Sequence, residues 1–149
     1  MASKNDSPTD ALDLVTSLYR TTNAFVRELD RRLLLETDIT FVQALTLLAI
    51  GSFDRPQPRL VAEFLSQQSQ TVTGVLDRLE RAGYIKRVRD LDDRRAVRLE
   101  LTLTGKALLA ATGERLRQHV TDLLSAADKA TRNRLATDLE DLESSIRRA

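Results

Sequence analysis

The sequence predicts a mainly α-helical fold with one small β-hairpin, and three observations support this prediction. Only 5 glycines and 3 prolines occur in 149 residues, which favours long helices over a many-turned β architecture. Two short helical patterns with a tight link between them precede two strand-like runs, residues 84–89 and 96–101. Longer helical patterns lie at both ends of the chain. Because an isolated two-stranded hairpin is only marginally stable, it must pack against the helix pair, which gives a winged helix–turn–helix.

The first helix is predicted from a capping pattern and a long apolar stripe. Ser7 is the expected N-cap, a proline follows it, and Asp10 closes a capping box. Residues 1–8 are expected to form a disordered N-terminus, and the helix is expected to end near Glu36 or Thr37. Its stripe recurs at three- and four-residue spacing, on Leu14, Leu18, Thr22, Phe25, Leu29 and Leu33.

A second capping box, formed by Thr40 and Gln43, begins a mostly apolar helix that is expected to run through about Ile50. The sequence Arg-Pro-Gln-Pro at residues 55–58 then interrupts helical structure.

The helix pair follows this break. Residues 66–68 are the expected turn between its two members, and Gly83 is the expected left-handed stop after the second. The first helix is marked by Val61, Ala62 and Leu65. The second has one apolar stripe at i, i+3, i+4 and i+7, on Val72, Val75, Leu76 and Leu79.

The hairpin and two further helices complete the chain. The second strand alternates apolar and charged residues, which is typical of a strand with one buried face. The hairpin is expected to form a wing of two to three strands. Thr102 or Thr104 is expected to cap a long helix, and Ser125 with Asp128 resembles one more capping box before the last helix. The last helix has its apolar stripe on Leu135, Leu139, Leu142 and Ile146.

These elements predict one interlocked domain with two functional regions. Residues 9–37 and 104–149 are expected to form a helical dimerisation region. Residues 38–103 are expected to form the winged helix–turn–helix lobe.

Composition excludes several classes of protein. The chain has no cysteine and one histidine, His119, which excludes disulfides, thiol nucleophiles and Cys/His zinc sites. No nucleophile–base pair or metal-ligand spacing occurs, so we expect no enzyme, no metal and no cofactor. The longest conspicuous uncharged stretch, residues 39–53, is shorter than the about 18 residues that a membrane span requires, and no signal peptide precedes it. We therefore expect a soluble, cytoplasmic protein.

The outer face of the second helix of the pair has the residue types that suit a DNA groove. Hydroxyl side chains reach phosphates, and a glutamine can pair with adenine in the major groove. A glycine inside a helix costs about 1 kcal/mol against alanine, and a close approach of the backbone to another surface would explain it. The alternative is an ordinary solvated face. The residues concerned are Ser69, Gln70, Thr71, Thr73 and Gly74.

The hairpin adds positive charge. Residues 86–98 contain six basic and three acidic side chains, in a protein of net charge +1. A solvated turn is the simpler explanation of such a run when it is taken alone. Together with the helix face and the order of elements, it favours nucleic-acid binding.

The region from Val61 to Gly105 resembles the MarR (multiple antibiotic resistance regulator) family of bacterial transcription factors. The resemblance rests on QTVTGVLDRLERAG at residues 70–83 and on DRRAVRLELT at residues 93–102, which fits the family's Asp-x-Arg, five residues, Leu-Thr pattern. The candidate DNA-binding residues are then Ser69, Gln70, Thr71, Thr73, Gly74, Arg78, Arg87, Arg94 and Arg95. Asp93 is the expected support of the wing, since it lies two residues before Arg95 on the same side of an extended chain.

The resemblance implies a homodimer whose first and last helices interlock on a double-stranded, pseudo-palindromic operator. Recognition helices would enter successive major grooves, and each wing arginine the minor groove. It also implies a repressor relieved by a small aromatic or anionic effector. Phe25, Phe41 and Phe53 are weak candidates for an effector pocket, with core packing as the alternative for each. A winged-helix adaptor that binds protein instead of DNA is the alternative function.

Overall fold

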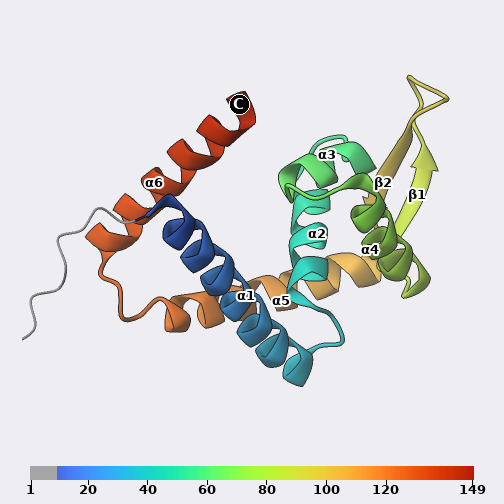
Figure 1. Cartoon of the computed structure of the whole chain (residues 1–149). Helices are drawn as coiled ribbons and strands as arrows, with labels where there is room; N and C mark the ends of the chain where they lie inside the picture. Colours follow the sequence, from blue (N-terminus) through green and yellow to red (C-terminus); the bar gives the residue numbers. More distant parts are fainter. Residues whose placement is uncertain (1–9) are drawn as a thin grey trace, which may run out of the picture.

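The computed structural model describes residues 10–149 and confirms the predicted order of elements (Figure 1). Helix α1 spans Ala11–Glu36, α2 Phe41–Ser52, α3 Pro58–Phe64 and α4 Ser69–Arg81. Strands β1 (Ile85–Arg89) and β2 (Val97–Leu101) follow, and then helices α5 (Leu103–Leu123) and α6 (Lys129–Arg148). The fold is a winged helix–turn–helix with long helices before and after it.

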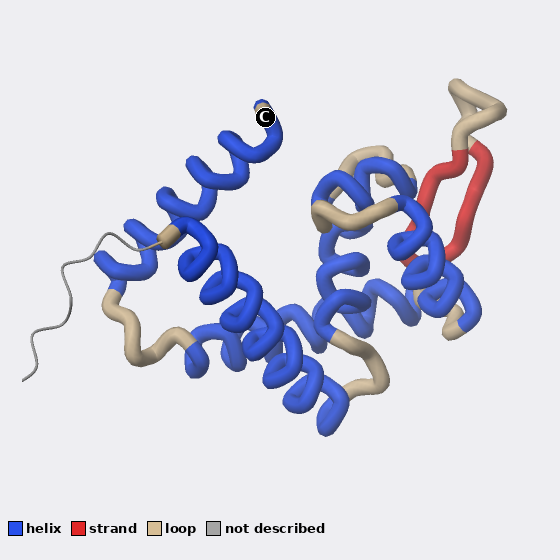
Figure 2. The backbone as a smooth tube through the Cα atoms, viewed as in Figure 1, coloured by secondary structure: helices blue, strands red, loops and turns tan. Residues whose placement is uncertain are grey.

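The hairpin is one antiparallel sheet of two strands within the described residues. Ile85 pairs with Leu101 and Arg87 pairs with Leu99, so these four side chains lie on one face. The backbone N–H of Leu99 also donates to the carbonyl of Pro56 at 2.8 Å, which attaches β2 to the loop before α3. Figure 2 shows the hairpin at the outer edge of the molecule, next to α4.

One hydrophobic core joins the lobe to the C-terminal half of α1 and to α5. Leu33 of α1, Leu47 of α2, Leu76 of α4 and Leu99 of β2 are all at most 1% exposed. Helix α6 adds no buried residue to this core. Its apolar stripe stays exposed, from 37% at Leu142 to 66% at Ile146.

Two predicted helix starts are wrong, and both errors have the same cause. The N-cap of α1 is Asp10, whose carboxylate accepts from the N–H of Leu12, so the helix begins at Ala11. Ser7 lies outside the described residues. The N-cap of α6 is Asp128, which accepts from Thr131, whereas Ser125 had been expected to cap. In each Ser-x-x-Asp sequence, the aspartate is the capping residue.

The remaining helix signals are confirmed. Thr40 and Gln43 form both bonds of the capping box of α2. Thr102 caps α5 by accepting from the N–H of Gly105. Gly83 ends α4 with φ of +81°, a conformation that favours glycine. The expected turn at residues 66–68 separates α3 from α4.

No single helix in the described part of the chain is long and apolar enough to cross a membrane. Helices α1 and α2 pass such a test only when taken together, with an 82° bend between them. Five residues of α2 are buried in the protein core.

Candidate nucleic-acid interface

The outer face of α4 is open to solvent between Ser69 and Arg78. The side chains of Ser69, Gln70, Thr71, Thr73 and Arg78 are exposed. The N-terminus of α4 has no side-chain cap, in contrast to α1, α2, α5 and α6, so its first N–H groups are available to an anion. The structure thus brings the predicted residues of α4 together on one accessible surface.

The hydroxyl of Thr73 is not free to donate a hydrogen bond to a phosphate. Its hydroxyl donates to the carbonyl of Ser69 within the helix, at 2.9 Å. The oxygen keeps its lone pairs, so it accepts hydrogen bonds but has already used its own proton.

Gly74 lies in open space. A Cβ atom added to it would meet no atom of the chain within 4 Å. Packing within the protein therefore does not require glycine here, although glycine is a poor residue for a helix interior. An external surface that comes close to the backbone is the remaining steric reason for it.

The tip of the wing is an ordered turn built on Asp90. This side chain is 6% exposed, and its carboxylate accepts from the N–H groups of Asp92 (2.9 Å) and Asp93 (3.4 Å). Those bonds, the one to Asp92 above all, hold the pKa of Asp90 below its usual value. Asp93 in turn accepts from the backbone N–H of Arg95 at 3.0 Å. The tip is a fixed platform for exposed side chains.

Asp93, the expected support of the wing, makes no ion pair with the guanidinium of Arg95. Asp93 binds the backbone of Arg95 instead, and neither Arg94 nor Arg95 makes an ion pair with any residue of the described chain. Both side chains are exposed. Two adjacent guanidinium groups therefore extend from the tip of the hairpin with their charge uncompensated.

Two other basic residues of the hairpin share one carboxylate. Lys86 lies 3.1 Å and Arg98 lies 2.6 Å from the carboxylate of Glu100, on the sheet face opposite Arg87. The two cations lower the pKa of Glu100, Lys86 more strongly than Arg98. Of the six basic residues in this run, Arg89, Arg94 and Arg95 are exposed and make no ion pair within residues 10–149.

Arg87 is placed differently from its predicted role. Its guanidinium bonds with Asp77 (2.7 Å) and with Glu80, both on α4, and its side chain is 26% exposed. The alternation of β1 could have shown this, because Arg87 shares its face with the buried Ile85. Arg87 joins two parts of the lobe and does not extend into solvent as Arg94 and Arg95 do.

Sequence reasoning also missed an ion pair that anchors the wing. Arg55, in the loop after α2, lies 2.6 Å from Asp92 at the hairpin tip. These residues are 37 positions apart, and no local pattern in the sequence connects them. The charged neighbours of Arg55, Asp92 first, raise its pKa.

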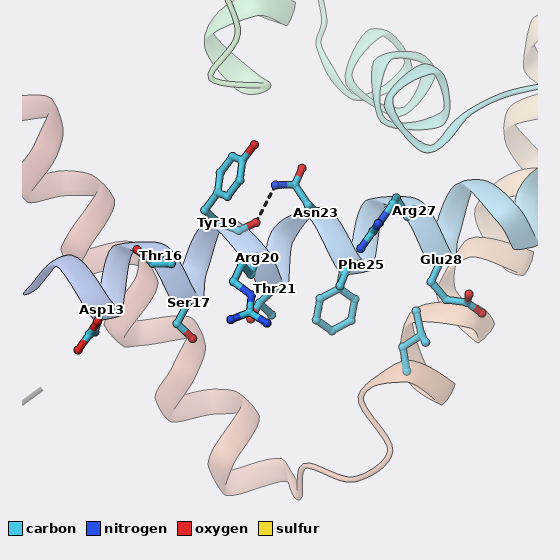
Figure 3. A pocket seen from close by; sticks show the side chains of 12 residues that line it. Asp13, Thr16, Ser17, Tyr19, Arg20, Thr21, Asn23, Phe25, Arg27 and Glu28 are labelled. Carbon is cyan, nitrogen blue, oxygen red and sulfur yellow. Dashed lines mark hydrogen bonds between the residues drawn. The ribbon is translucent and has the colours of Figure 1, made fainter. Parts of the chain in front are cut away.

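The three phenylalanines proposed for an effector pocket separate into two groups. Phe41 and Phe53 pack against the core, and the rings of Phe53 and Phe64 meet edge-to-face at 5.9 Å. Phe25 lines an open hollow of about 1120 Å³ beside α1, to which α5 contributes Leu123. Figure 3 shows Phe25 on the side of α1 opposite Tyr19 and Asn23. The hollow surrounds an exposed helix and is not an enclosed cavity.

Among residues 10–149, no three His or acidic residues gather as a metal site. His119 is half-buried on α5, with Nε2 3.4 Å from the carboxylate of Glu36 on α1. It therefore contacts a neighbouring helix.

Comparison with known proteins agrees with this geometry. Residues 37–96 match the family model described as MarR family. The HTH-type transcriptional regulator SarZ of Staphylococcus saprophyticus is 36% identical over 71 residues, which are 48% of this chain and 49% of SarZ. The chain spans about half the length of the curated relatives that it matches.

Two solved structures extend the likeness beyond the lobe. A MarR/EmrR family transcriptional regulator from Acinetobacter sp. ADP1 has a TM-score of 0.85, with 15% identity over 91% of this chain and 96% of that one. The S. aureus MepR–DNA complex has a TM-score of 0.78, with 25% identity over 89% and 97%.

The matching proteins are transcriptional regulators, which agrees with the expectation that the chain is not an enzyme. The family model covers the helix–turn–helix and the wing tip, and the shared fold covers the terminal helices as well. Residues 37–96 of the chain are thus similar to the MarR family.

Proposed function

We propose that the protein is a transcriptional regulator that binds double-stranded DNA through α4 and the wing. The observation that carries this proposal is the pairing of an open, glycine-containing face of α4 with two uncompensated arginines on the adjacent hairpin tip. A helix of this kind fits the major groove, and arginines bind the negative potential of a narrow minor groove. The MepR–DNA complex, which shares the fold, supports the assignment.

The proposed DNA contacts are Ser69, Gln70, Thr71, Thr73, Gly74, Arg78, Arg94 and Arg95. Gln70 is assigned to a base edge, because an amide side chain pairs with adenine in two places. Arg87 is not among these contacts, because two carboxylates already engage its guanidinium.

The regulator acts as a homodimer in this proposal. Large apolar side chains on α1 and α6 are between 37% and 71% exposed to solvent. They are the stripe on α6 and, on α1, Leu12, Leu14, Val15 and Tyr19. Burying both helices between two copies would cover them in an interface of obligate size, above about 2,000 Å². Sedimentation velocity at micromolar concentration is expected to show a dimer, and a folded monomer would contradict this part.

Two copies related by a twofold axis would place two α4 helices on half-sites about 34–36 Å apart. Binding to such a pseudo-palindromic operator represses transcription by excluding polymerase. An effector that favours another spacing of the two lobes would release the DNA. The hollow beside Phe25 is the proposed effector site, and the nearby Arg20 and Arg27 suit a small aromatic anion. Such a regulator acts in the cytoplasm, where its operator lies.

Selection from a random library of duplexes, followed by fluorescence polarisation with the selected sequence, tests the proposal. We expect enrichment of an inverted repeat and binding at least about a thousandfold tighter than to unrelated duplex. Absence of both enrichment and salt-sensitive binding would favour a winged-helix adaptor that binds protein.

A further inference from the structure

Arg87 forms the most extensive ionic connection between α4 and the wing. Its Nη2 atom donates to Oδ1 of Asp77 at 2.7 Å, and its Nη1 atom donates to Glu80. Its backbone N–H also donates to Oε1 of Glu80, at 3.2 Å. Three hydrogen bonds thus connect the middle of β1 to the C-terminal half of α4.

This cluster has the wrong charge for a phosphate contact. One guanidinium faces two carboxylates, so the three groups together carry a net charge of −1. A phosphate would be repelled by Asp77 and Glu80 before it reached Arg87. The exposed tip arginines Arg94 and Arg95 have no such partners within residues 10–149.

The position of the cluster determines how two DNA-binding elements are oriented. Asp77 lies on the same outer face of α4 as Gln70 and Thr73, by helical spacing. The link therefore joins the recognition face to the hairpin at a point outside the apolar core. A helix in the major groove and a wing in the neighbouring minor groove must keep a fixed relation, or one of them loses its contacts.

We propose that Arg87 is a positioning residue, which sets the orientation of the wing against α4 through Asp77 and Glu80 and does not itself bind DNA. This inference rests on the proposed DNA-binding function. It differs from the prediction made from charge composition, which places Arg87 among the DNA contacts.

The test compares Arg87→Gln with Arg94→Gln, since each substitution removes one positive charge from the hairpin. DNA affinity is measured by fluorescence polarisation at several salt concentrations, on the selected duplex and on an unrelated duplex. Arg87→Gln is expected to weaken binding to the selected duplex by about three- to tenfold and leave the log–log salt slope unchanged. Arg94→Gln is expected to lower the magnitude of the slope by about 0.9.

Two more variants separate positioning from general loss of structure. Arg87→Lys keeps one donor and is expected to recover part of the affinity for the selected duplex. Glu80→Gln removes a negative charge, so electrostatics alone predicts tighter DNA binding, whereas positioning predicts weaker binding. Combining Glu80→Gln with Arg87→Gln is expected to weaken binding no further than Arg87→Gln alone, because both remove the same link. Should Arg87→Gln fail to fold, as judged by circular dichroism, Glu80→Gln decides the question alone.

The outcomes distinguish the two proposals. Wild-type protein that binds no duplex contradicts the proposed function. Wild-type binding, with a salt slope that falls by about 0.9 in Arg87→Gln or with tighter binding by Glu80→Gln, contradicts positioning and leaves the proposed function intact.

Discussion

Asp93 holds Arg95 through its backbone, with 3.0 Å between the carboxylate Oδ1 and the amide nitrogen. The carboxylate therefore shapes the hairpin tip while the guanidinium remains exposed. Asp90 acts in the same way, because its buried carboxylate accepts hydrogen bonds from the backbone N–H groups of Asp92 and Asp93. Two acidic residues at the tip are thereby structural, although their charge opposes DNA binding.

Replacing Asp93 separates its charge from its hydrogen bond. Asp93→Ala is expected to weaken DNA binding by up to about 1 kcal/mol, because the turn that presents Arg95 loses an acceptor. Asp93→Asn keeps an acceptor oxygen and is expected to bind at least as tightly as wild type. Fluorescence polarisation at physiological salt measures both. If both variants bind more tightly by the same factor, Asp93 acts only through its charge.

Gly74 is expected to separate stability from DNA binding. Gly74→Ala should raise the free energy of unfolding by about 0.5–1 kcal/mol, since open space surrounds the new Cβ and alanine is the better helix former. Gly74→Leu should fold as well and lose DNA affinity by at least about tenfold, because its side chain fills the gap between helix and groove. Urea denaturation and polarisation give the two quantities. Unimpaired DNA binding by the leucine variant would remove the close-approach explanation.

Gly105 is expected to show the opposite effect. A Cβ at this position would lie 1.9 Å from the carbonyl oxygen of Tyr84, so the first turn of α5 rests directly on the turn that follows α4. Gly105→Ala is expected to destabilise the fold by about 1–3 kcal/mol. Gly113→Ala, on the same helix, is the matched control, because its nearest neighbour would be the end of the Arg117 side chain at 3.9 Å. Equal thermal midpoints for the two variants, at one protein concentration, would contradict the close packing.

Stability is expected to depend on pH through Asp90. Its folded pKa lies below the ordinary 3.8 because it accepts backbone hydrogen bonds as a carboxylate. Its charge therefore stabilises the fold above pH about 4, and this contribution is lost as pH falls through the folded pKa. Asp90→Asn keeps an acceptor without the charge, so its urea midpoint should lie below that of wild type at pH 7. The difference should shrink as pH falls below the ordinary pKa of 3.8, and a difference independent of pH would contradict this role.

The element order was predictable because each helix carries its own apolar stripe and the hairpin its own alternation. The first residue of each helix was harder to predict. Ser7 to Asp10 and Ser125 to Asp128 both satisfy a capping box, but an aspartate that is itself the N-cap produces the same spacing. The local sequence cannot show whether the serine or the aspartate is the N-cap, because the choice depends on the path of the chain before the helix.

The candidate site was predictable where one element supplies it and not where two elements meet. The accessible face of α4 follows from helical periodicity alone. Composition could not separate Arg87 from Arg94 and Arg95, because its partners Asp77 and Glu80 lie on another element. The pair of Arg55 with Asp92 depends wholly on the tertiary fold.

The salt dependence of DNA binding tests the central claim most directly, with Arg95→Ala compared against wild type. Arg95→Ala is expected to cost about 1–3 kcal/mol on the selected duplex and to lower the magnitude of the log–log salt slope by about 0.9. Arg134→Ala on α6, an exposed arginine without an ion pair in the described chain, removes the same charge and is expected to leave both values unchanged. A wild-type affinity that does not respond to salt, or an Arg95→Ala slope equal to that of wild type, would contradict DNA binding through the wing.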